Sequence, residues 1–372
     1  MKSNFTLLFS FVIVQIGMAQ IPAGYYNTAT GTGYTLKTQL SAIITAGHID
    51  QGYDAFDTFT AVHDLDNYTT YENDGTILDV YSENPNGVDP YNYTPITDEC
   101  GNYNAEGVCY NKEHVIPQSI FSQNYPMRSD AHHLLPTDGR VNGFRSNYPF
   151  GNVGSNLISQ SGISNPTLNG SKLGNYVNTG LFAGYSGTVF EPVDEFKGDI
   201  ARIYFYFITR YESQIANWTY DMFTTTSQGL SNPFLYTLLD WHLNDPVSQK
   251  EIDRNNALYN YQGNRNPYVD HPEYVCQIWS SFCTTLGANT FTANTSFGIY
   301  PNPSQNGDFN ISTKHTLNSI TIYNVNGQIV QHIINPTVSN KVYTISNLAS
   351  GFYWVQLLDG ENGIFTTKII VN

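Results

Sequence analysis

The apolar residues in the middle of the chain recur mainly at helical spacing. The clearest pattern runs from 194 to about 213, where one apolar stripe follows Asp194, a residue type that often caps a helix N-terminus. The stripe consists of Ile200, Ile203, Tyr204, Phe207, Ile208 and Tyr211. A stripe of this kind predicts a long helix with one face buried in a core.

Other segments have weaker patterns of the same kind. Helical spacing predicts helices over 35–46 and 231–244, and a third that starts after Pro246 and ends near Tyr259. The short run ILDVYS at 77–82 is instead typical of a strand. The chain before position 284 therefore mixes helices with strands, which predicts an α+β domain over 20–284.

The pattern changes after Cys283. A stretch rich in Thr, Asn and Gly at 285–296 predicts a linker. Over 297–372 short β-type runs alternate with turn residues, and the Asn326-Gly327 dipeptide between two runs is typical of a β-hairpin. Six or seven such runs in this segment predict a small all-β sandwich.

The first 19 residues have the three parts of a secretory signal peptide. Lys2 supplies the positive start, an apolar run follows, and Gly17-Met18-Ala19 forms a small-residue cleavage site before Gln20. No later apolar run reaches the roughly 20 residues of a membrane-spanning helix, so we expect a secreted chain without a transmembrane segment.

Export would place the four cysteines in an oxidising compartment. Three pairings are possible, and the most economical one closes two short loops, Cys100 with Cys109 and Cys276 with Cys283. A zinc site is the alternative, although the chain lacks the CxxC pairs that structural zinc sites use. We expect the two local disulfides.

Composition and charge narrow the class of protein. Hydrophobic residues make up 40% and charged residues 13%, which favours a folded, loop-rich extracellular protein over a disordered chain. The net charge of −15 argues against a protein that coats nucleic acid through a basic face. The acidity is uneven, because 13 of the 31 acidic residues lie in 20–110, whereas residues 111–150 sum to +1. The net charge of the whole chain therefore does not give the local charge of a site within residues 111–150.

Asp64, Asp66 and Asp74 form an acidic group inside the negative segment. Carboxylates at close spacing can bind calcium, but the spacing of an EF-hand loop is missing. The favoured interpretation is an ordinary solvated loop.

Residues 111–150 concentrate histidines, acids, bases and asparagines. Hydrolysis of a phosphodiester needs a base to deprotonate water, a divalent cation to neutralise the phosphoryl oxygens, and stabilisation of the leaving alkoxide. Histidine suits the base because its pKa lies near neutrality, and carboxylate and amide oxygens suit Mg²⁺. Glu113, His114 and Asn142 supply these groups. Since neighbours on a strand point to opposite faces, Glu113 and His114 can share a site only at a strand end or bend.

This segment resembles the endonuclease I family, nonspecific nucleases with a ββα-metal (His-Me finger) fold. The matching pieces are EHVIP, SDAHHLLPTDGRVNG and FRSNYPFG, and the similarity continues through KGDIARIYFYFITRY, LLDWHLNDPVS and QGNRNPYVDHPE. It covers roughly residues 30–280. The resemblance implies that His114 is the general base and that Glu113 and Asn142 bind the metal, with Asn142 on a helix packed against the strand hairpin.

Three further residues fall on recurrent positions of the family motif. We interpret Arg145 as catalytic, and Asp130 and His132 as groups that lie behind the site or toward the substrate. For Asp130 the alternative is a helix cap.

Three more arginines are candidates for the substrate side of the site. Arg202 and Arg265 could contact phosphate, and a structural salt bridge is the alternative for each. Some relatives have a long Cys-bearing insertion whose arginine stabilises the leaving group. Here a short stretch replaces it, and Arg128 is the arginine that this stretch contains.

The last part of the chain has its own resemblance. YPNPSQNGDFNI, the Asn-Gly hairpin and LASGFYWVQL resemble the C-terminal sorting domain of the type IX secretion system of Bacteroidetes, over 297–372. The resemblance implies a transport tag that engages the secretion machinery and directs the protein across the outer membrane. A carbohydrate-binding or adhesive sandwich shares this architecture and is the alternative.

The sequence therefore predicts a secreted, monomeric, nonspecific endonuclease that cuts DNA and RNA and leaves 5′-phosphate ends. Mg²⁺ is the expected cofactor, with Ca²⁺ or Mn²⁺ as substitutes. One alternative is a zinc hydrolase that uses His114, His132, His133 and a carboxylate, although HExxH is absent. The other is a non-enzymatic surface adhesin, which fits the sorting domain but not the clustered polar residues.

Overall fold

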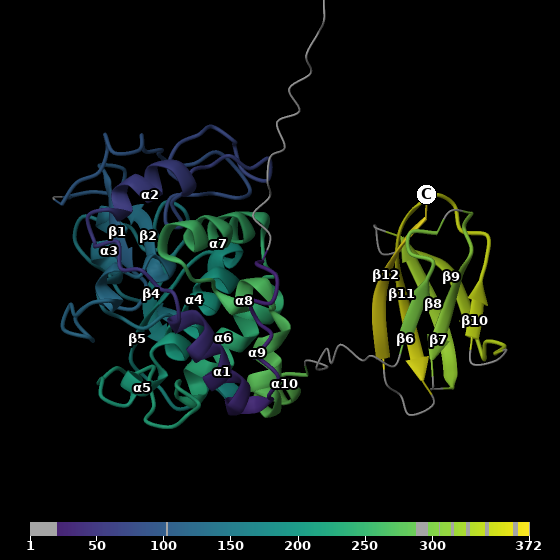
Figure 1. Cartoon of the computed structure of the whole chain (residues 1–372). Coiled ribbons are helices and arrows are strands. Elements are labelled where there is room, and N and C mark those ends of the chain that lie inside the picture. The colour runs from purple at the N-terminus through teal and green to yellow at the C-terminus, as the bar shows by residue number, and fades with distance from the viewer. Residues whose placement is uncertain are drawn as a thin grey trace, which may run out of the picture. The chain divides into compact units, whose positions relative to one another are not determined.

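The computed structural model divides the chain into two compact units, Met1–Thr290 and Phe291–Asn372 (Figure 1). It describes residues 21–101, 103–287, 297–304, 306–313, 316–324, 328–338, 342–359 and 364–371. The expected signal peptide at 1–19, most of the expected linker and the Asn326-Gly327 dipeptide lie outside the described residues. In the part of the chain that is described, no helix has the length and apolar character needed to cross a membrane.

The first unit is built around helix α4, Lys197–Arg210, in which every residue from Gly198 onward is buried. Helices α1 (Gly33–Thr45) and α6 (Asn232–Asn244) pack against it. The helix group is completed by α2 (Phe56–His63), α5 (Glu212–Ile215), α7 (Gln249–Gln262), α8 (Pro267–Asp270), α9 (Glu273–Ile278) and α10 (Ser280–Thr285). The four helices predicted from hydrophobic spacing are confirmed as α1, α4, α6 and α7.

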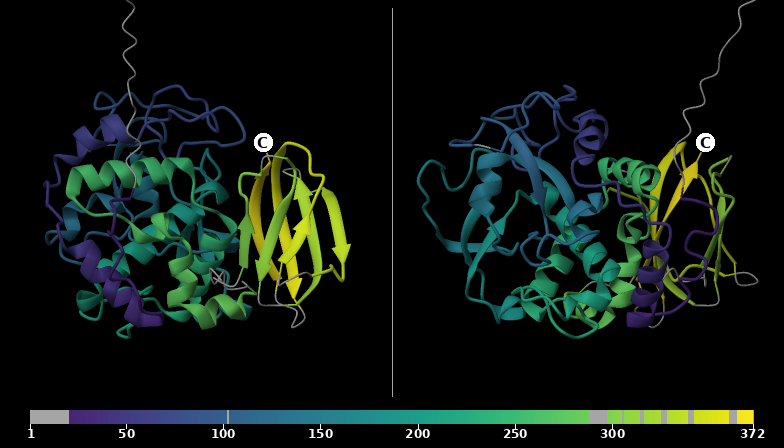
Figure 2. Two further views of the ribbon diagram at one scale, coloured as in Figure 1. Left: turned by 45° about the vertical axis from the view of Figure 1, so that its right-hand side comes forward. Right: turned by 60° about the vertical axis from the view of Figure 1, so that its left-hand side comes forward.

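The strands of this unit lie to one side of the helix group (Figure 1 and the right-hand view of Figure 2). Strand β1, Tyr110–His114, pairs antiparallel with β2, Leu134–Asp138, so that His114 lies opposite Leu134. Helix α3, Gly139–Arg145, follows β2 directly, and its first turn is capped by the Asp138 carboxylate, which accepts from the Val141 amide at 2.7 Å. The order β1-β2-α3 is a ββα unit, and the α+β prediction is confirmed.

A second sheet has the order β3-β4-β5, from Val153–Leu157, Lys172–Tyr176 and Thr188–Glu191. Among the described residues of the unit, four 3₁₀ turns connect the regular elements. They are η1 (Met127–Ser129), η2 (Ala131–His133), η3 (Gly180–Phe182) and η4 (Asp194–Phe196). The first two lie in the connection between β1 and β2.

Two sequence predictions in this unit are wrong in detail. Residues 77–82 do not form a strand: Ile77 makes only an isolated bridge with Leu65, and 80–82 are a turn, where the Asp79 carboxylate accepts from the Tyr81 amide at 2.7 Å. Asp194 does not cap α4, which begins three residues later at Lys197. Its carboxylate instead forms an ion pair with the Lys197 ammonium at 2.6 Å.

Both predicted disulfides are confirmed. Cys100 pairs with Cys109 in the loop that leads into β1, and Cys276 pairs with Cys283 to join α9 to α10. The zinc alternative for these cysteines is therefore excluded.

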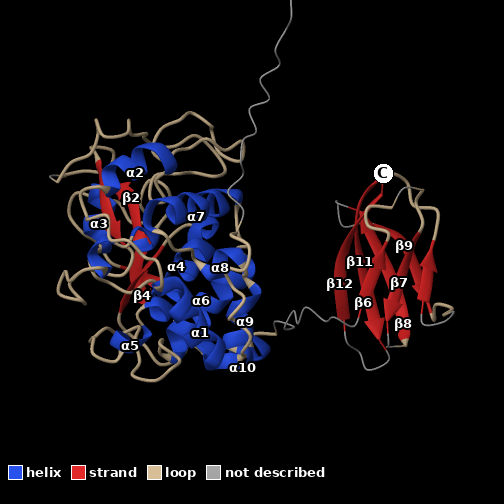
Figure 3. Ribbon diagram, in the orientation of Figure 1, coloured by secondary structure: helices blue, strands red, loops and turns tan. Residues whose placement is uncertain are grey.

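The second unit contains only strands among its described regular elements, as the colours of Figure 3 show. A three-stranded sheet has the order β10-β7-β6 and a four-stranded sheet the order β12-β11-β8-β9. Their bounds are β6 Phe297–Tyr300, β7 Phe309–Thr313, β8 Leu317–Asn324, β9 Ile329–Ile334, β10 Val342–Ile345, β11 Gly351–Asp359 and β12 Ile364–Val371. Side chains of both sheets, among them Ile311, Ile322 and Val355, share one buried core, so the predicted small sandwich is confirmed.

Candidate active site

Glu113 and His114 are the last two residues of β1. This agrees with the expectation that two neighbouring residues can share a site only where a strand ends or bends. Both side chains are buried, with 2% and 5% of their surface exposed. Their neighbours differ, because adjacent residues of a strand face opposite ways. Glu113 contacts the side chains of Tyr81 and Arg145, whereas the imidazole of His114 lies beside Tyr53 and His133.

The Glu113 carboxylate is held through one of its two oxygens. Oε1 accepts from the Tyr81 hydroxyl at 3.0 Å and from Nη1 of Arg145 at 3.0 Å. Within the described residues Oε2 makes no hydrogen bond, so it is the oxygen that a cation can reach. Burial raises the pKa of Glu113 to about 7, against the opposing effects of Arg145 and Tyr81.

Arg145 is buried and its hydrogen bonds are directed at the end of β1. Besides Glu113, its guanidinium donates to the main-chain oxygens of His114 at 3.0 Å and Val115 at 2.7 Å, and it lies over the Phe150 ring. With 1% of its surface exposed, it has no face to offer a substrate. The prediction that Arg145 is catalytic is therefore corrected: the structure makes it a positioning residue for Glu113 and the strand end.

Asn142 lies one helical turn before Arg145 on α3, and so on the same face of the helix. Its Nδ2 donates to Oδ1 of Asn111 at 2.8 Å and to the main-chain oxygen of Lys112 at 3.3 Å. These bonds fix the orientation of the amide, so its oxygen is the end opposite the bonded nitrogen. Asn111 and Glu113, two residues apart on β1, share the strand face that α3 covers.

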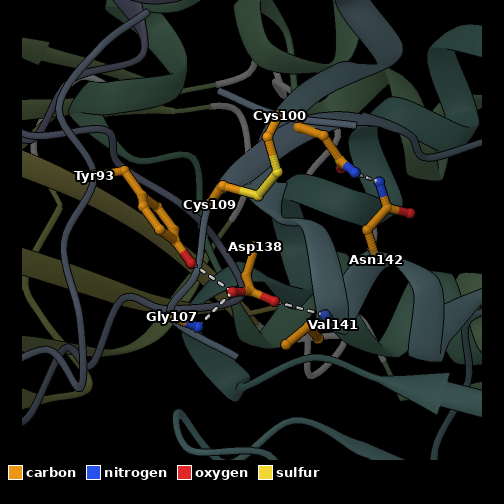
Figure 4. Close-up of a disulfide and its surroundings, with 8 residues drawn as sticks. Tyr93, Cys100, Gly107, Cys109, Asp138, Val141 and Asn142 are labelled. Atoms are coloured by element: carbon orange, nitrogen blue, oxygen red, sulfur yellow. Dashed lines mark hydrogen bonds between the residues drawn. A yellow bond between two sulfur atoms is a disulfide. The ribbon is translucent and has the colours of Figure 1, made fainter. Parts of the chain in front are cut away.

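Asp138 fixes the junction between β2 and α3 (Figure 4). Its carboxylate accepts from the hydroxyl of Tyr93 at 2.5 Å and from the amide of Gly107 at 2.9 Å, in addition to the cap on Val141. The Cys100–Cys109 disulfide lies beside this junction. These bonds therefore fix the start of α3, the helix that contains Asn142.

The His114 imidazole is oriented by a main-chain oxygen. Nε2 lies 2.9 Å from the oxygen of Arg128, and since a carbonyl can only accept, Nε2 must carry the proton. Burial, and then the neighbouring His133, lower the pKa of His114 to about 3, so the ring is neutral at physiological pH. A neutral ring protonated on Nε2 has its lone pair on Nδ1, which makes no hydrogen bond within the described residues.

The donor set fits the divalent cation that the family implies. Oε2 of Glu113 is a carboxylate oxygen without a partner among the described residues, and the bonds of Asn142 Nδ2 leave its amide oxygen as the free end. Hard oxygens of these two types are the ligands that Mg²⁺ prefers, with water in its other positions. The sequence prediction for these two residues is thus compatible with the arrangement of their atoms.

Asp130 and His132 are buried behind the strand end and do not face a substrate. Asp130 accepts from the hydroxyls of Tyr206 and Tyr211, each at 2.9 Å, and also caps η2 through the His132 amide. Although burial raises its pKa, the imidazoles of His132 and His48 hold the pKa of Asp130 well below its usual range. Of the two places predicted for Asp130 and His132, the one behind the site agrees with the structure and the one toward the substrate does not; Asp130 also has the predicted role of a cap.

The arginines separate into two kinds. Arg202 and Arg265 are buried and paired with carboxylates: Arg202 with Glu251 at 2.5 and 2.8 Å, and Arg265 with Asp270 at 2.6 and 2.7 Å. Their prediction as phosphate contacts is wrong, because the alternative, a structural salt bridge, already occupies each guanidinium. Arg128 differs, since it is half-buried and stacks over the Tyr53 ring at 4.9 Å.

The zinc alternative finds no support in the described residues. His114, His132 and His133 each direct Nε2 at a main-chain oxygen, those of Arg128, Asn264 and Met127 respectively. In that part of the chain the one group of His, Cys, Asp or Glu close enough to hold a metal ion contains no histidine.

Four residues of the site were missed by the sequence reasoning: Tyr53, Tyr81, Asn111 and Lys112. Asn111 could have been found, because strand alternation places it on the same face as Glu113. Lys112 lies over the Tyr53 ring at 4.5 Å and forms an ion pair with Asp57 at 2.5 Å. Tyr53 and Tyr81 come from distant loops, and no local pattern marks them.

Comparison with known proteins gives matches over both units. A family model described as Endonuclease I matches residues 32–273, and one described as Secretion system C-terminal sorting domain matches 298–372. The chain is 33% identical over 265 residues to "Extracellular ribonuclease" of Bacillus subtilis (strain 168), covering 68% of this chain and 78% of that protein. The protein of the same name from Bacillus amyloliquefaciens is 33% identical over 262 residues, with the same two shares. "Endonuclease-1" of Buchnera aphidicola subsp. Acyrthosiphon pisum (strain APS) is 29% identical over 143 residues, covering 38% and 45%.

Proposed function

Since the chain belongs to the endonuclease I family and is a secreted nuclease with a type IX sorting domain, we propose that it hydrolyses DNA and RNA without sequence specificity and leaves 5′-phosphate ends. The observation that carries the proposal is the state of His114. Its proton is held on Nε2 by the Arg128 main-chain oxygen, which leaves the Nδ1 lone pair available as a base at the end of β1. A general base within reach of water is what phosphodiester hydrolysis requires of a side chain.

In the proposed reaction, Nδ1 of His114 takes a proton from the attacking water. The pKa of about 3 in the substrate-free protein is low for a base that works near neutrality. A bound phosphodiester is an anion, and a negative charge close to the ring raises the pKa of an imidazole. The hydrogen bond to Arg128 keeps the ring in the productive tautomer throughout.

The other residues hold the components in place. Glu113 and Asn142 would bind a divalent cation, which supplies positive charge at the phosphoryl oxygens. Arg145 holds Glu113 and the end of β1 together through its bonds to Glu113, His114 and Val115. The guanidinium of Arg128, stacked on the Tyr53 ring beside His114, is the cation that we assign to the substrate phosphate.

Nothing in this scheme uses the 2′-hydroxyl of RNA, which supports activity on both nucleic acids. The names of the relatives, an extracellular ribonuclease and an endonuclease, are consistent with either substrate. The direct test is cleavage of matched 5′-labelled DNA and RNA strands, with Mg²⁺ and with EDTA, followed by analysis of the new ends. Cleavage of both, abolished by EDTA and leaving 5′-phosphates, is expected. Activity that persists in EDTA, or 3′-phosphate ends, would contradict the mechanism.

Replacing Glu113 by glutamine should weaken cation binding without disturbing the fold. The glutamine oxygen can keep the bonds to Tyr81 and Arg145, while its NH₂ group replaces Oε2, the oxygen without a partner among the described residues. Loss of a residue that supports a metal site typically costs about 10–100-fold in affinity, and loss of a ligand should cost no less. We expect the Mg²⁺ concentration for half-maximal cleavage to rise by at least about 10-fold.

The matched control is Glu195→Gln, which changes an exposed glutamate outside the site. Its Mg²⁺ requirement should equal that of the wild type. An unchanged Mg²⁺ requirement in Glu113→Gln would remove Glu113 from the set of ligands.

A further inference from the structure

A second group of carboxylates lies in the loops between α2 and β1. Asp66, Glu72 and Glu83 each place one oxygen within 4.8 Å of the oxygens of the other two. Asp66 and Glu83 are buried and Glu72 is exposed, so the group has a polar side open to solvent. None of the three belongs to the ββα unit that holds Glu113 and Asn142.

Glu83 is the unusual member of the group. Only 1% of its surface is exposed, and both carboxylate oxygens are buried without a hydrogen-bond partner among the residues that the structure describes. A buried carboxylate without partners is strongly unfavourable when ionised. Burial, and then the negative charges of Asp89, Glu72 and Asp66, raise its pKa to about 9. In the described part of the chain, no hydrogen-bond donor offsets the cost of burying this carboxylate.

Lys250 is the cation that lowers the pKa of Glu83, but it is paired with another carboxylate. Its ammonium forms an ion pair with Asp199 at 2.5 Å. The two unpaired oxygens of Glu83 therefore point to a partner that is not part of the described chain, and a metal ion is the partner that three convergent carboxylates suit.

The Asp66 carboxylate is held rigidly by the loop that surrounds it. Oδ1 accepts from the Tyr68 amide at 3.2 Å and Oδ2 from the Asn73 amide at 2.6 Å. The main chain of Asp66 is bonded to Thr76 at 2.9 Å and to Gly75 at 2.8 Å. A ligand at Asp66 would therefore act on the whole 66–76 loop.

We propose that Asp66, Glu72 and Glu83 form a calcium site, separate from the active site, that stabilises the loops before β1. Two oxygens that share one Ca²⁺ at about 2.3–2.6 Å can lie up to roughly 5 Å apart, which agrees with the separation observed. Ca²⁺ accepts many oxygen ligands in flexible geometry, whereas Mg²⁺ demands a near-ideal octahedron. A group with two buried members and one exposed member suits the more tolerant ion.

The sequence favoured a solvated loop for Asp64, Asp66 and Asp74, and the proposed site uses only one of these three residues. Asp66 belongs to the site, but Asp64 is paired with Arg254 at 2.6 Å, and Asp74 accepts from the amide of Thr76 at 2.9 Å within its own turn. Glu72 and Glu83 take their places because the loops fold back on Asp66, which no spacing rule predicts.

Thermal unfolding with and without Ca²⁺ tests the proposal. All chains compared carry Glu113→Gln, which weakens cation binding in the active site and makes the remaining contribution of that site the same in every chain. At about 100-fold excess over its Kd, Ca²⁺ should raise the Tm of this background by roughly 5–10 °C. Adding Glu83→Gln or Glu72→Gln should remove most of that shift. Since glutamine removes the repulsion, Glu83→Gln without Ca²⁺ should be no less stable than the background.

Asp221→Asn, an exposed acid elsewhere in the unit, is the matched control and should keep the full shift. Equilibrium dialysis should find one fewer Ca²⁺ per chain in Glu83→Gln than in the background. Equal Ca²⁺ shifts in the control and in both glutamine variants would overturn the proposal. So would a background Tm that does not respond to Ca²⁺, since the three acids would then share a proton instead of a cation.

Discussion

Replacing His114 by alanine is expected to lower the single-turnover rate of cleavage by roughly 10²–10⁴-fold, the usual contribution of a general base. The residue acts only in the chemical step of the proposed mechanism, so the affinity for substrate and for Mg²⁺ should change little. The ring packs between Tyr53 and His133, and its removal leaves a space at the strand end. The measurement is single-turnover cleavage of a short labelled duplex across a Mg²⁺ titration.

Two comparisons separate a chemical role of His114 from a structural one. Imidazole added to His114→Ala should restore part of the rate, because the vacated space can admit a small base. His63→Ala removes an exposed histidine at the end of α2 and should cleave at the wild-type rate. A His114→Ala protein that is folded and cuts at a near wild-type rate would rule out the base assignment.

The main helices were predictable because their signal is local. The stripe that includes Ile203 and Phe207 is long and strongly periodic, and α4 is the helix on which α1 and α6 pack. The strand prediction at 77–82 was wrong for a reason that is also local but that the hydrophobic pattern does not show. Asp79 satisfies the Tyr81 amide with its own side chain, and a backbone held in that turn cannot join a ladder.

The site was predictable where family motifs and strand geometry agree, and not elsewhere. Glu113 and His114 do end a strand, and Asn142 does lie on the helix that covers it. The burial of Arg145 was not predictable, because its partners lie on β1 and just beyond it, about 30 residues before it in the chain. The sequence alone does not show whether an arginine will bind a phosphate or a buried carboxylate.

Arg202 is the clearest case of that ambiguity, and its replacement should change stability rather than activity. Its guanidinium makes two bonds to Glu251 and one, at 2.8 Å, to the main-chain oxygen of Asp245. Arg202→Met fills much of the same space but leaves the Glu251 carboxylate buried and unpaired. Breaking a buried ion pair from one side typically costs about 3–5 kcal/mol. For a domain of this size that corresponds to a fall in Tm of roughly 6–20 °C.

The reason for the loss can be tested by removing the second charge. Arg202→Met combined with Glu251→Gln has no unpaired ion left in the core, so it should recover part of the lost Tm even though it contains one more substitution. Arg140→Met changes an arginine that bonds Gln160 and Ser161 near the surface, and should leave the Tm nearly unchanged. Below its Tm the Arg202→Met protein should cleave with the wild-type KM, because the guanidinium is fully enclosed and cannot meet a phosphate. A wild-type Tm together with a raised KM would reverse this assignment and return Arg202 to the substrate side of the site.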